Sequence, residues 1–324
     1  MDWTSPPSEI ARALLGADGG VEILDAGQAP AWRQSIAIGL DRDGDWSAGD
    51  AFDIAITTKG AAPRPWIHVP PAELDAKLSA LIAAARARPV AAQIARFVLR
   101  VGDQLPFDAA LDLESLAYSL LLASDEFKAW RAAHPFPPRA EPRERVRVGR
   151  SDAGWLIELS RPQARNAFDA QMRDALVEAL DNVGADPTNA PVELRGVGPS
   201  FSAGGDLAEF GAATDPGLAH LVRTTQSPGR LIWAMRERVT VRLHGACIGA
   251  GIEIPAAASR VVAAPGATMG LPEVSMGLIP GAGGCATIPR RIGRHRTLYW
   301  LLSGETLSAE QALHWRLIDA IEPL

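Results

Sequence analysis

Cysteine is scarce in this chain of 324 residues, which contains only Cys247 and Cys285. Two cysteines cannot build the disulfide framework of a small secreted domain, so we expect a protein of the reducing cytoplasm. No cluster of cysteine and histidine has the spacing of a zinc site. The sequence therefore predicts no metal.

Long apolar runs are also missing. No run approaches the roughly 20 residues of a transmembrane helix, and Met1–Pro7 lacks the basic start and apolar stretch of a secretory signal. Basic residues are not in excess, because 32 lysines and arginines oppose 38 acids and give a formal net charge of −6. We therefore expect neither a membrane protein nor a nucleic-acid-binding protein, and we interpret the basic run Arg290–Arg296 as the solvated side of a helix.

The composition that remains is typical of a soluble globular protein, with 47% apolar and 22% charged residues. Residues 1–66 are mixed in character, with one clear strand pattern at Phe52–Thr58, and we interpret them as an extension of unknown role. Residues 67–138 carry helical patterns whose apolar faces need a partner surface, which predicts a helical subdomain. These helices are expected from Pro70, from Pro89 and over 109–131.

Residues 139–150 read as a linker, because they are rich in proline and charge, and the tail of this segment is expected to start a strand. Strand and helix patterns then alternate over 151–324, which predicts an α/β core. Strands are expected at 155–159, 192–197, 239–244 and 260–264, and helices at 169–183, 217–236, 250–258, 294–302 and 308–316.

Two segments rich in small residues, Phe201–Leu207 and His244–Glu253, stand where a strand pattern gives way to a helical one. Small residues there let backbone N–H groups at a helix start face open space, where they can hold an oxyanion. The second segment also carries a carboxylate, Glu253. Either segment alone could be a tight turn chosen for packing, but the two together favour a site for a thioester enolate.

Residues 150–324 resemble the crotonase superfamily, the enoyl-CoA hydratase/isomerase family. The resemblance implies an α/β fold with a ββα spiral core, an α-helical subdomain, and assembly as a homo-oligomer, a trimer or hexamer. It also implies an acyl-CoA thioester as substrate, which itself carries coenzyme A, and no other cofactor. The two segments above carry this resemblance together with Arg161–Phe168, Gly270–Val274, Gly277–Gly284 and Leu302–Glu310.

By this resemblance, the amides of Gly205 and Ala250 form the oxyanion hole. The family usually has glycine at the second position. Alanine keeps its N–H, so only a backbone angle forbidden to alanine would disable the hole. The resemblance also implies contacts with the substrate for Ala164, Ala203, Asp206, Leu207, Gly249 and Gly281.

Glu253 and Glu273 match the family's acids that hold the catalytic water and move its protons. Hydration of a conjugated enoyl thioester needs one carboxylate to take a proton from water and a protonated partner to deliver one to the α-carbon. Burial and mutual repulsion would raise at least one pKa toward neutrality. Taken separately, Glu253 could instead stabilise a helix dipole and Glu273 could be a solvated turn residue.

The helical segment Val69–Pro135 is similar to the region that follows the core in that family, whereas here the core match runs to Leu324. We therefore expect a circular permutation that places the helical cap before the core, with an unrelated helical extension as the alternative.

An isomerase that moves a single proton needs only one acid, so the presence of both favours an enoyl-CoA hydratase. The alternatives are an isomerase, another enolate reaction of the superfamily such as hydrolysis or cofactor-free oxygenation, and a non-catalytic CoA-binding protein. The acyl group is not predicted, because residues 208–235, which would shape its pocket, carry no motif for chain length.

Overall fold

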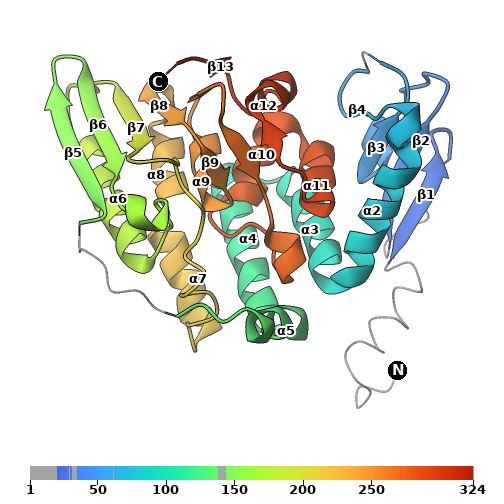
Figure 1. The fold of residues 1–324 in the computed structure, drawn as a ribbon, viewed down its shortest axis with the longest axis horizontal. Helices are drawn as coiled ribbons and strands as arrows, with labels where there is room; N and C mark the ends of the chain where they lie inside the picture. Colours follow the sequence, from blue (N-terminus) through green and yellow to red (C-terminus); the bar gives the residue numbers. More distant parts are fainter. Residues whose placement is uncertain (1–19, 29, 31–34, 61, 138–143, 324) are drawn as a thin grey trace.

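The computed structural model describes residues 20–28, 30, 35–60, 62–137 and 144–323 (Figure 1). Residues 1–19 of the expected extension and 139–143 of the expected linker therefore lie outside the described residues. Two sheets lie at opposite ends of the molecule in Figure 1, and most of the helices stand between them.

The sheet that comes first in the chain has four parallel strands in the order β1-β2-β3-β4. Every residue of β2 and β3 is buried, which is typical of a parallel sheet covered on both faces. The strand expected at 52–58 is β3, whereas the other three strands were not predicted. The strands are β1 Val21–Asp25, β2 Ile36–Asp41, β3 Ile54–Thr57 and β4 Ile67–His68.

Four helices follow this sheet, and the expected third helix proves to be two. The Ser124 side chain accepts a hydrogen bond from the Phe127 amide at 3.3 Å, which caps the start of a new helix. The expected helix over 109–131 is therefore divided, because the capped turn interrupts its hydrogen bonding. The helices are α2 Leu74–Ala87, α3 Pro89–Gly102, α4 Phe107–Leu122 and α5 Asp125–Ala133.

The second large sheet has six strands in the order β13-β10-β8-β7-β6-β5, all parallel except for the β5–β6 hairpin. Strand β5 begins at Val146, inside the range expected for the linker, in agreement with the strand expected at its tail. The four strands expected between 155 and 264 are all present. The strands are β5 Val146–Ser151, β6 Gly154–Leu159, β7 Val192–Gly196, β8 Val239–Leu243, β10 Arg260–Ala263 and β13 Ala320–Ile321.

A small sheet, in the order β12-β11-β9, stands beside the large one. The chain passes from β8 to β9 and from β10 to β11, so each turn adds one strand to each sheet. This repetition winds the core into a ββα spiral, as the resemblance implied. The small strands, which were not predicted because each has only two or three residues, are β9 Ala246–Ile248, β11 Thr268–Gly270 and β12 Leu307–Ser308.

Prolines divide two helices that were expected to be continuous. Pro228 starts a new helix after the Ser227 cap, so the pattern at 217–236 becomes α7 and α8, and Pro255 leaves α9 only four residues long. The core helices are α6 Ala170–Gly184, α7 Pro216–Thr225, α8 Pro228–Ala234, α9 Ala250–Glu253, α10 Gly284–Ile292, α11 Arg294–Ser303 and α12 Ala309–Trp315. Short 3-10 helices occur at Gly49–Ala51, Pro71–Glu73, Pro162–Ala164, Arg236–Arg238, Pro255–Ala257 and Glu273–Met276.

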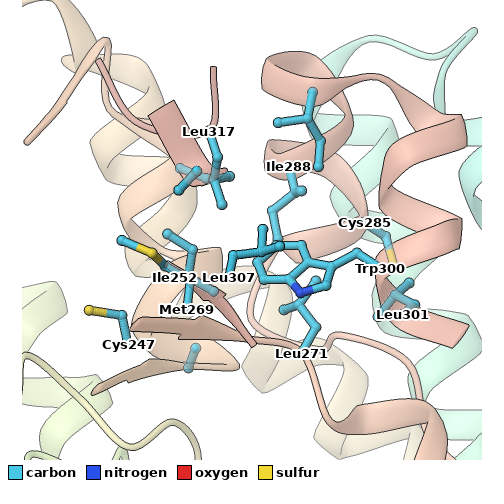
Figure 2. Close-up of a cluster of buried hydrophobic side chains, with 14 of the residues drawn as sticks. Cys247, Ile252, Met269, Leu271, Cys285, Ile288, Trp300, Leu301, Leu307 and Leu317 are labelled. Carbon is cyan, nitrogen blue, oxygen red and sulfur yellow. The ribbon is translucent and has the colours of Figure 1, made fainter. Parts of the chain in front are cut away.

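Helices α10 and α11 join the helical segment to the spiral core. Helix α2 packs on α11, α4 packs on α10, and α3 packs on both. Trp300, from α11, is fully buried at the centre of the apolar cluster that Figure 2 shows. This cluster draws its other labelled side chains from the small sheet and the residue after β11, from α9, α10 and α11, and from the segment after α12: Cys247, Ile252, Met269, Leu271, Cys285, Ile288, Leu301, Leu307 and Leu317.

The sequence had suggested that the basic run Arg290–Arg296 is the solvated side of a helix, and this prediction is wrong. His295 and Arg296 are only 5% and 9% exposed. Arg294 donates hydrogen bonds to the backbone carbonyls of Phe52 and Asp50 at 3.0 and 2.6 Å. This part of the run therefore ties the first sheet to the start of α11 instead of facing solvent.

Candidate active site

The two segments rich in small residues lie side by side in the structure. The Ser202 amide donates to the Ala246 carbonyl at 3.2 Å, and the Ile248 amide donates to the Ser202 carbonyl at 3.0 Å. A β-carbon at Gly204 would lie 2.6 Å from the Ile248 carbonyl oxygen, and one at Gly251 would lie 2.6 Å from that of Ser202. The small residues are therefore needed because the two backbones touch.

This contact brings two free backbone amides to one cavity. Within the described chain, the amides of Gly205 and Ala250 donate no hydrogen bond, and both residues line the same cavity. Ala250 is the first residue of α9 and has an ordinary helical conformation. The unusual backbone angles fall on Gly249, with φ 51° and ψ −121°, a region that glycine adopts readily. Alanine at 250 therefore keeps an unstrained, available N–H.

Two buried carboxylates meet above Gly249. Glu253 and Glu273 are only 2% and 7% exposed. A β-carbon on Gly249 would lie 2.6 Å from Glu273 Oε1 and 3.6 Å from Glu253 Oε1, so both oxygens face the same small space. Glu273 Oε2 is buried and accepts no hydrogen bond from the described residues. Both residues line the same cavity as the two amides.

The loop before α10 fixes the other oxygen of Glu253. Glu253 Oε2 accepts hydrogen bonds from the amides of Ala282 at 2.7 Å and Gly284 at 3.0 Å. Burial raises the pKa of Glu253, and these two amides partly oppose that rise. Burial, followed by the charge of Glu253, holds the pKa of Glu273 well above its usual range. The two acids therefore differ, because two amides of this loop favour the ionised form of Glu253, whereas the backbone donor to Glu273 is its own amide.

A third buried acid, Glu114 of α4, holds the alternate amides of the same loop. Its Oε1 accepts from the Gly283 amide at 2.7 Å and its Oε2 from the Cys285 amide at 2.6 Å. Burial, and then the charge of Glu253, raise the pKa of Glu114 well above its usual range. Glu114 was not predicted as a site residue from the sequence. A signal was present, since it stands on an apolar helical face with Leu111 and Tyr118.

The amides and acids face a cavity of about 250 Å³. The core supplies one wall, α4 supplies Leu111, Ser115 and Tyr118, and α7 and α8 supply Arg223 and Arg230. None of these wall residues from α4, α7 and α8 was predicted, because no motif marks them. The predicted site residues that line the cavity are Gly205, Asp206, Ala250, Glu253, Glu273 and Gly281.

Four predicted residues are not among those that line this cavity. Gly249 packs against the two acids, as described above. Ala164 is the last residue of a 3-10 helix. The Ala203 amide donates a hydrogen bond at 2.8 Å to the carbonyl of Arg165, the residue after Ala164. Leu207 is half-buried after the first loop. Their contacts with a substrate stay predictions.

Two lining residues have structural partners that explain their identity. Asp206 forms an ion pair with the buried Arg161 at 2.8 Å, which holds the first of the two segments rich in small residues in place. A β-carbon on Gly281 would lie 2.6 Å from the Tyr118 ring, so glycine there makes room for α4 against the loop.

Residues 150–324 match the enoyl-CoA hydratase/isomerase family. The match covers more than half of the chain, and the chain therefore belongs to this family. The chain is 32% identical over 167 residues to a putative enoyl-CoA hydratase/isomerase, YngF of Bacillus subtilis (strain 168). That match covers 51% of this chain and 64% of YngF. It is 31% identical over 180 residues to the 2,3-dehydroadipyl-CoA hydratase of Escherichia coli (strain K12), covering 54% of this chain and 68% of that protein.

The fold is shared with solved structures of the same family. The crystal structure of an enoyl-CoA hydratase from Thermoplasma volcanium GSS1 matches with a TM-score of 0.51 and 31% identity. That match covers 55% of this chain and 71% of the solved one. The ββα spiral is therefore a crotonase-type fold, and the chain spans about two thirds of the length of the relatives it matches.

Neither a metal-binding cluster nor a membrane-spanning helix occurs among the described residues. No group of three or more histidine, cysteine, aspartate or glutamate side chains in that part of the chain is placed to hold a metal ion. No helix in it combines the length and the apolar character needed to cross a membrane. Cys247 and Cys285 are both buried and free.

Proposed function

We propose that this chain is an enoyl-CoA hydratase, which adds water across the 2,3-double bond of an acyl-CoA thioester. One observation carries the proposal: two buried acids, Glu253 and Glu273, converge above Gly249 in the cavity that the free amides of Gly205 and Ala250 line. The family match and the E. coli relative, named as a hydratase, support it.

The two amides would form the oxyanion hole. As the water oxygen attacks the β-carbon, the π electrons of the double bond move toward the thioester carbonyl and its oxygen becomes an enolate. Gly205 and Ala250 would each donate a hydrogen bond to that oxygen. One such donor contributes roughly 3–4 kcal/mol to lowering the barrier.

The two acids would move the protons of the water. Glu253 is the better base, because the amides of Ala282 and Gly284 favour its ionised form, and it would take a proton from the attacking water. Glu273, whose Oε2 has no donor among the described residues, would be protonated and deliver its proton to the α-carbon. The product thus gains a hydroxyl group from the water and a proton from Glu273, while Glu253 keeps the second proton of the water. Transfer of that proton from Glu253 to Glu273 would restore the starting states of both acids.

The test is the loss of the conjugated-thioester absorbance when purified protein is incubated with crotonyl-CoA. We expect turnover by the wild type, and losses of about a hundredfold or more in kcat for Glu253→Gln and Glu273→Gln. Both variants should still bind acyl-CoA, which serves as the control for folding. Full turnover by the double variant would contradict the assignment of the acids.

The alternatives give different outcomes in the same experiments. An isomerase would convert 3-enoyl-CoA and would need only one of the two acids. A hydrolase would release free coenzyme A, and an oxygenase would consume oxygen. Binding of acyl-CoA without turnover at any chain length would indicate a non-catalytic CoA-binding protein and would contradict the hydratase.

The proposed chemistry needs no metal and no cofactor beyond the coenzyme A of the substrate. We propose a cytoplasmic site of action, which the two free cysteines support. We also propose a homo-oligomer, a trimer or hexamer. Exposed leucines on α4 and α7 support this assembly, because these two helices pack on each other and each carries two leucines that are 56% to 63% exposed. These are Leu116, Leu120, Leu218 and Leu221, and light scattering on the purified protein tests the assembly.

We further propose that residues 67–138 are a circularly permuted cap on the core at 151–324. Packing of α2, α3 and α4 on α10 and α11 supports this proposal, as does the cavity wall that α4 supplies. A cap needs only its docking surface and not its place in the chain. The first sheet, through β3, also packs on α11.

A further inference from the structure

Arg223 of α7 is a half-buried cation in the wall of the cavity, and all its hydrogen-bond partners are neutral. Its Nε donates to Ser115 Oγ at 3.1 Å and its Nη2 to the Ser115 carbonyl at 3.3 Å. Nη2 also donates to Ser119 Oγ. These contacts with α4 hold the guanidinium in one place without neutralising its charge.

The other two arginines of this cavity wall are neutralised. Arg230 forms ion pairs with Asp108 and Asp112, both at 2.7 Å. Arg173 forms one with Asp174, also at 2.7 Å. No carboxylate in the described part of the chain forms an ion pair with Arg223, and its Nη1 donates no hydrogen bond there. A half-buried guanidinium without a counter-ion is costly, which argues for a partner that the chain itself does not supply.

None of the described acids that line the cavity forms an ion pair with Arg223. Glu114 attracts Arg223 through space, but its two oxygens accept hydrogen bonds from the amides of Gly283 and Cys285. Among the other acids of the wall, Glu253 accepts from backbone amides and Asp206 pairs with Arg161. The charge of Arg223 is therefore left to face the cavity.

One aromatic ring connects Arg223 to the acids. The guanidinium carbon lies 5.0 Å from the centre of the Tyr118 ring, in cation–π contact. The same ring packs against Gly281, which precedes the amide that anchors Glu253. An acyl chain whose reacting carbons lie at the acids, and which continues along Tyr118, would reach Arg223 with its far end.

We propose that Arg223 binds a carboxylate at the far end of the acyl chain, so that the preferred substrates are enoyl-CoA thioesters of dicarboxylic acids. The inference rests on the proposed hydratase function and specifies its substrate class. A guanidinium presents its N–H groups in a planar fork that matches a carboxylate, and two parallel hydrogen bonds fix the end of the chain. Leu111 and Tyr118 would cover the methylene groups between the two ends.

The test compares matched pairs of trans-2-enoyl-CoA thioesters that end in a methyl group or in a carboxylate, at several chain lengths. We expect the wild type to have the higher kcat/KM for the carboxylate form at its best chain length. Arg223→Gln should lower kcat/KM for that form by about ten- to a hundredfold and change it little for the methyl form. Arg230→Gln is the matched control, because it removes a neutralised arginine of the same wall, and it should affect both forms equally.

Several outcomes would overturn the inference. One is a wild type that prefers the methyl form at every length, and another is an equal loss of both forms in Arg223→Gln. Weaker binding of free coenzyme A by Arg223→Gln would also overturn it, because the guanidinium would then serve a phosphate of the coenzyme. If the wild type turns over no enoyl-CoA, the hydratase proposal fails instead. Calorimetry with saturated acyl-CoA pairs then still tests Arg223, because the wild type should bind the carboxylate form about tenfold more tightly and Arg223→Gln should not.

Discussion

At the scale of single residues, the site depends on the different surroundings of two carboxyl groups. Both are buried, but two backbone amides hold Glu253, whereas Glu273 Oε2 has no donor in the described chain. Different surroundings give the two acids different pKa values, and the difference decides which acid takes a proton and which one gives a proton.

The pH dependence of the rate follows from this difference. Burial raises the pKa of Glu253 to about 7, and that of Glu273 is raised well above its usual range. The rate should rise as the pH increases through about 7, because Glu253 must be ionised, and should fall once Glu273 loses its proton. The measurement is kcat/KM for crotonyl-CoA against pH. A profile that is flat across neutral pH would count against the proton-transfer roles.

Gly249 should be intolerant of any side chain. Its φ of 51° is strained for other residues, and a β-carbon would lie 2.6 Å from Glu273 Oε1. We expect Gly249→Ala to lower kcat by about a hundredfold or more, because misplacement of a catalytic group by about 1 Å has effects of that size. Gly266→Ala is the control, since nothing lies within 4 Å of the added carbon, and it should retain full activity. Equal activity of the two variants would sink the prediction.

At the scale of elements, one acid from α4 and one acid from α9 hold the same loop, residues 282–285. The successive amides of residues 282–285 donate alternately to Glu253 of α9 and Glu114 of α4. A peptide chain that alternates in this way is held from both sides. Glu114 is therefore a positioning residue, which acts on the chemistry through the loop that orients Glu253.

Replacing Glu114 with glutamine should separate the two catalytic constants. The side-chain amide can accept from only one of the two N–H groups and presents its own donor to the other, which costs about 1–3 kcal/mol of unfolding free energy. We expect Glu114→Gln to lower kcat about tenfold or more with KM little changed, because Glu253 loses its fixed orientation. The measurements are steady-state kinetics and thermal unfolding.

The control is Glu178→Gln on α6, which makes the same substitution at an exposed position away from the cavity. This variant should keep both constants. A Glu114→Gln enzyme that loses stability but keeps its kcat would show that the contact is structural only.

At the scale of the whole molecule, the fold was predictable where information is local and not where it depends on contacts between distant segments. Gly205, Ala250, Glu253 and Glu273 lie in motifs within one stretch of the core, and the structure gathers them. Glu114 meets the same loop from more than 160 residues away, and no local pattern announces that contact. The helix breaks at Ser124 and Pro228 had local signals, a cap and a proline, that the apolar periodicity outweighed.

The proposed permutation predicts that chain order can be changed. A chain opened between Pro137 and Glu144, with Leu324 joined to Met1 by a long Gly/Ser linker, places the helical segment after the core. We expect it to fold and to hydrate crotonyl-CoA at a rate within about tenfold of the wild type, because docking depends on surfaces. The wild type carrying the same linker at its C-terminus is the control. A soluble, folded product without activity would mean that the helical segment needs its original position.

Because Glu114 of α4 and Glu253 hold the same loop, enzymatic activity also depends on the docking of α4 on the core. While α4 has not docked, the amides of Gly283 and Cys285 have no acceptor, and the neighbouring amides that hold Glu253 are not fixed in place. A refolding chain whose ββα spiral has formed, but whose helical segment has not yet docked, would therefore have no hydration activity. During refolding, enzymatic activity would return in step with the docking of α4, later than the secondary structure of the core.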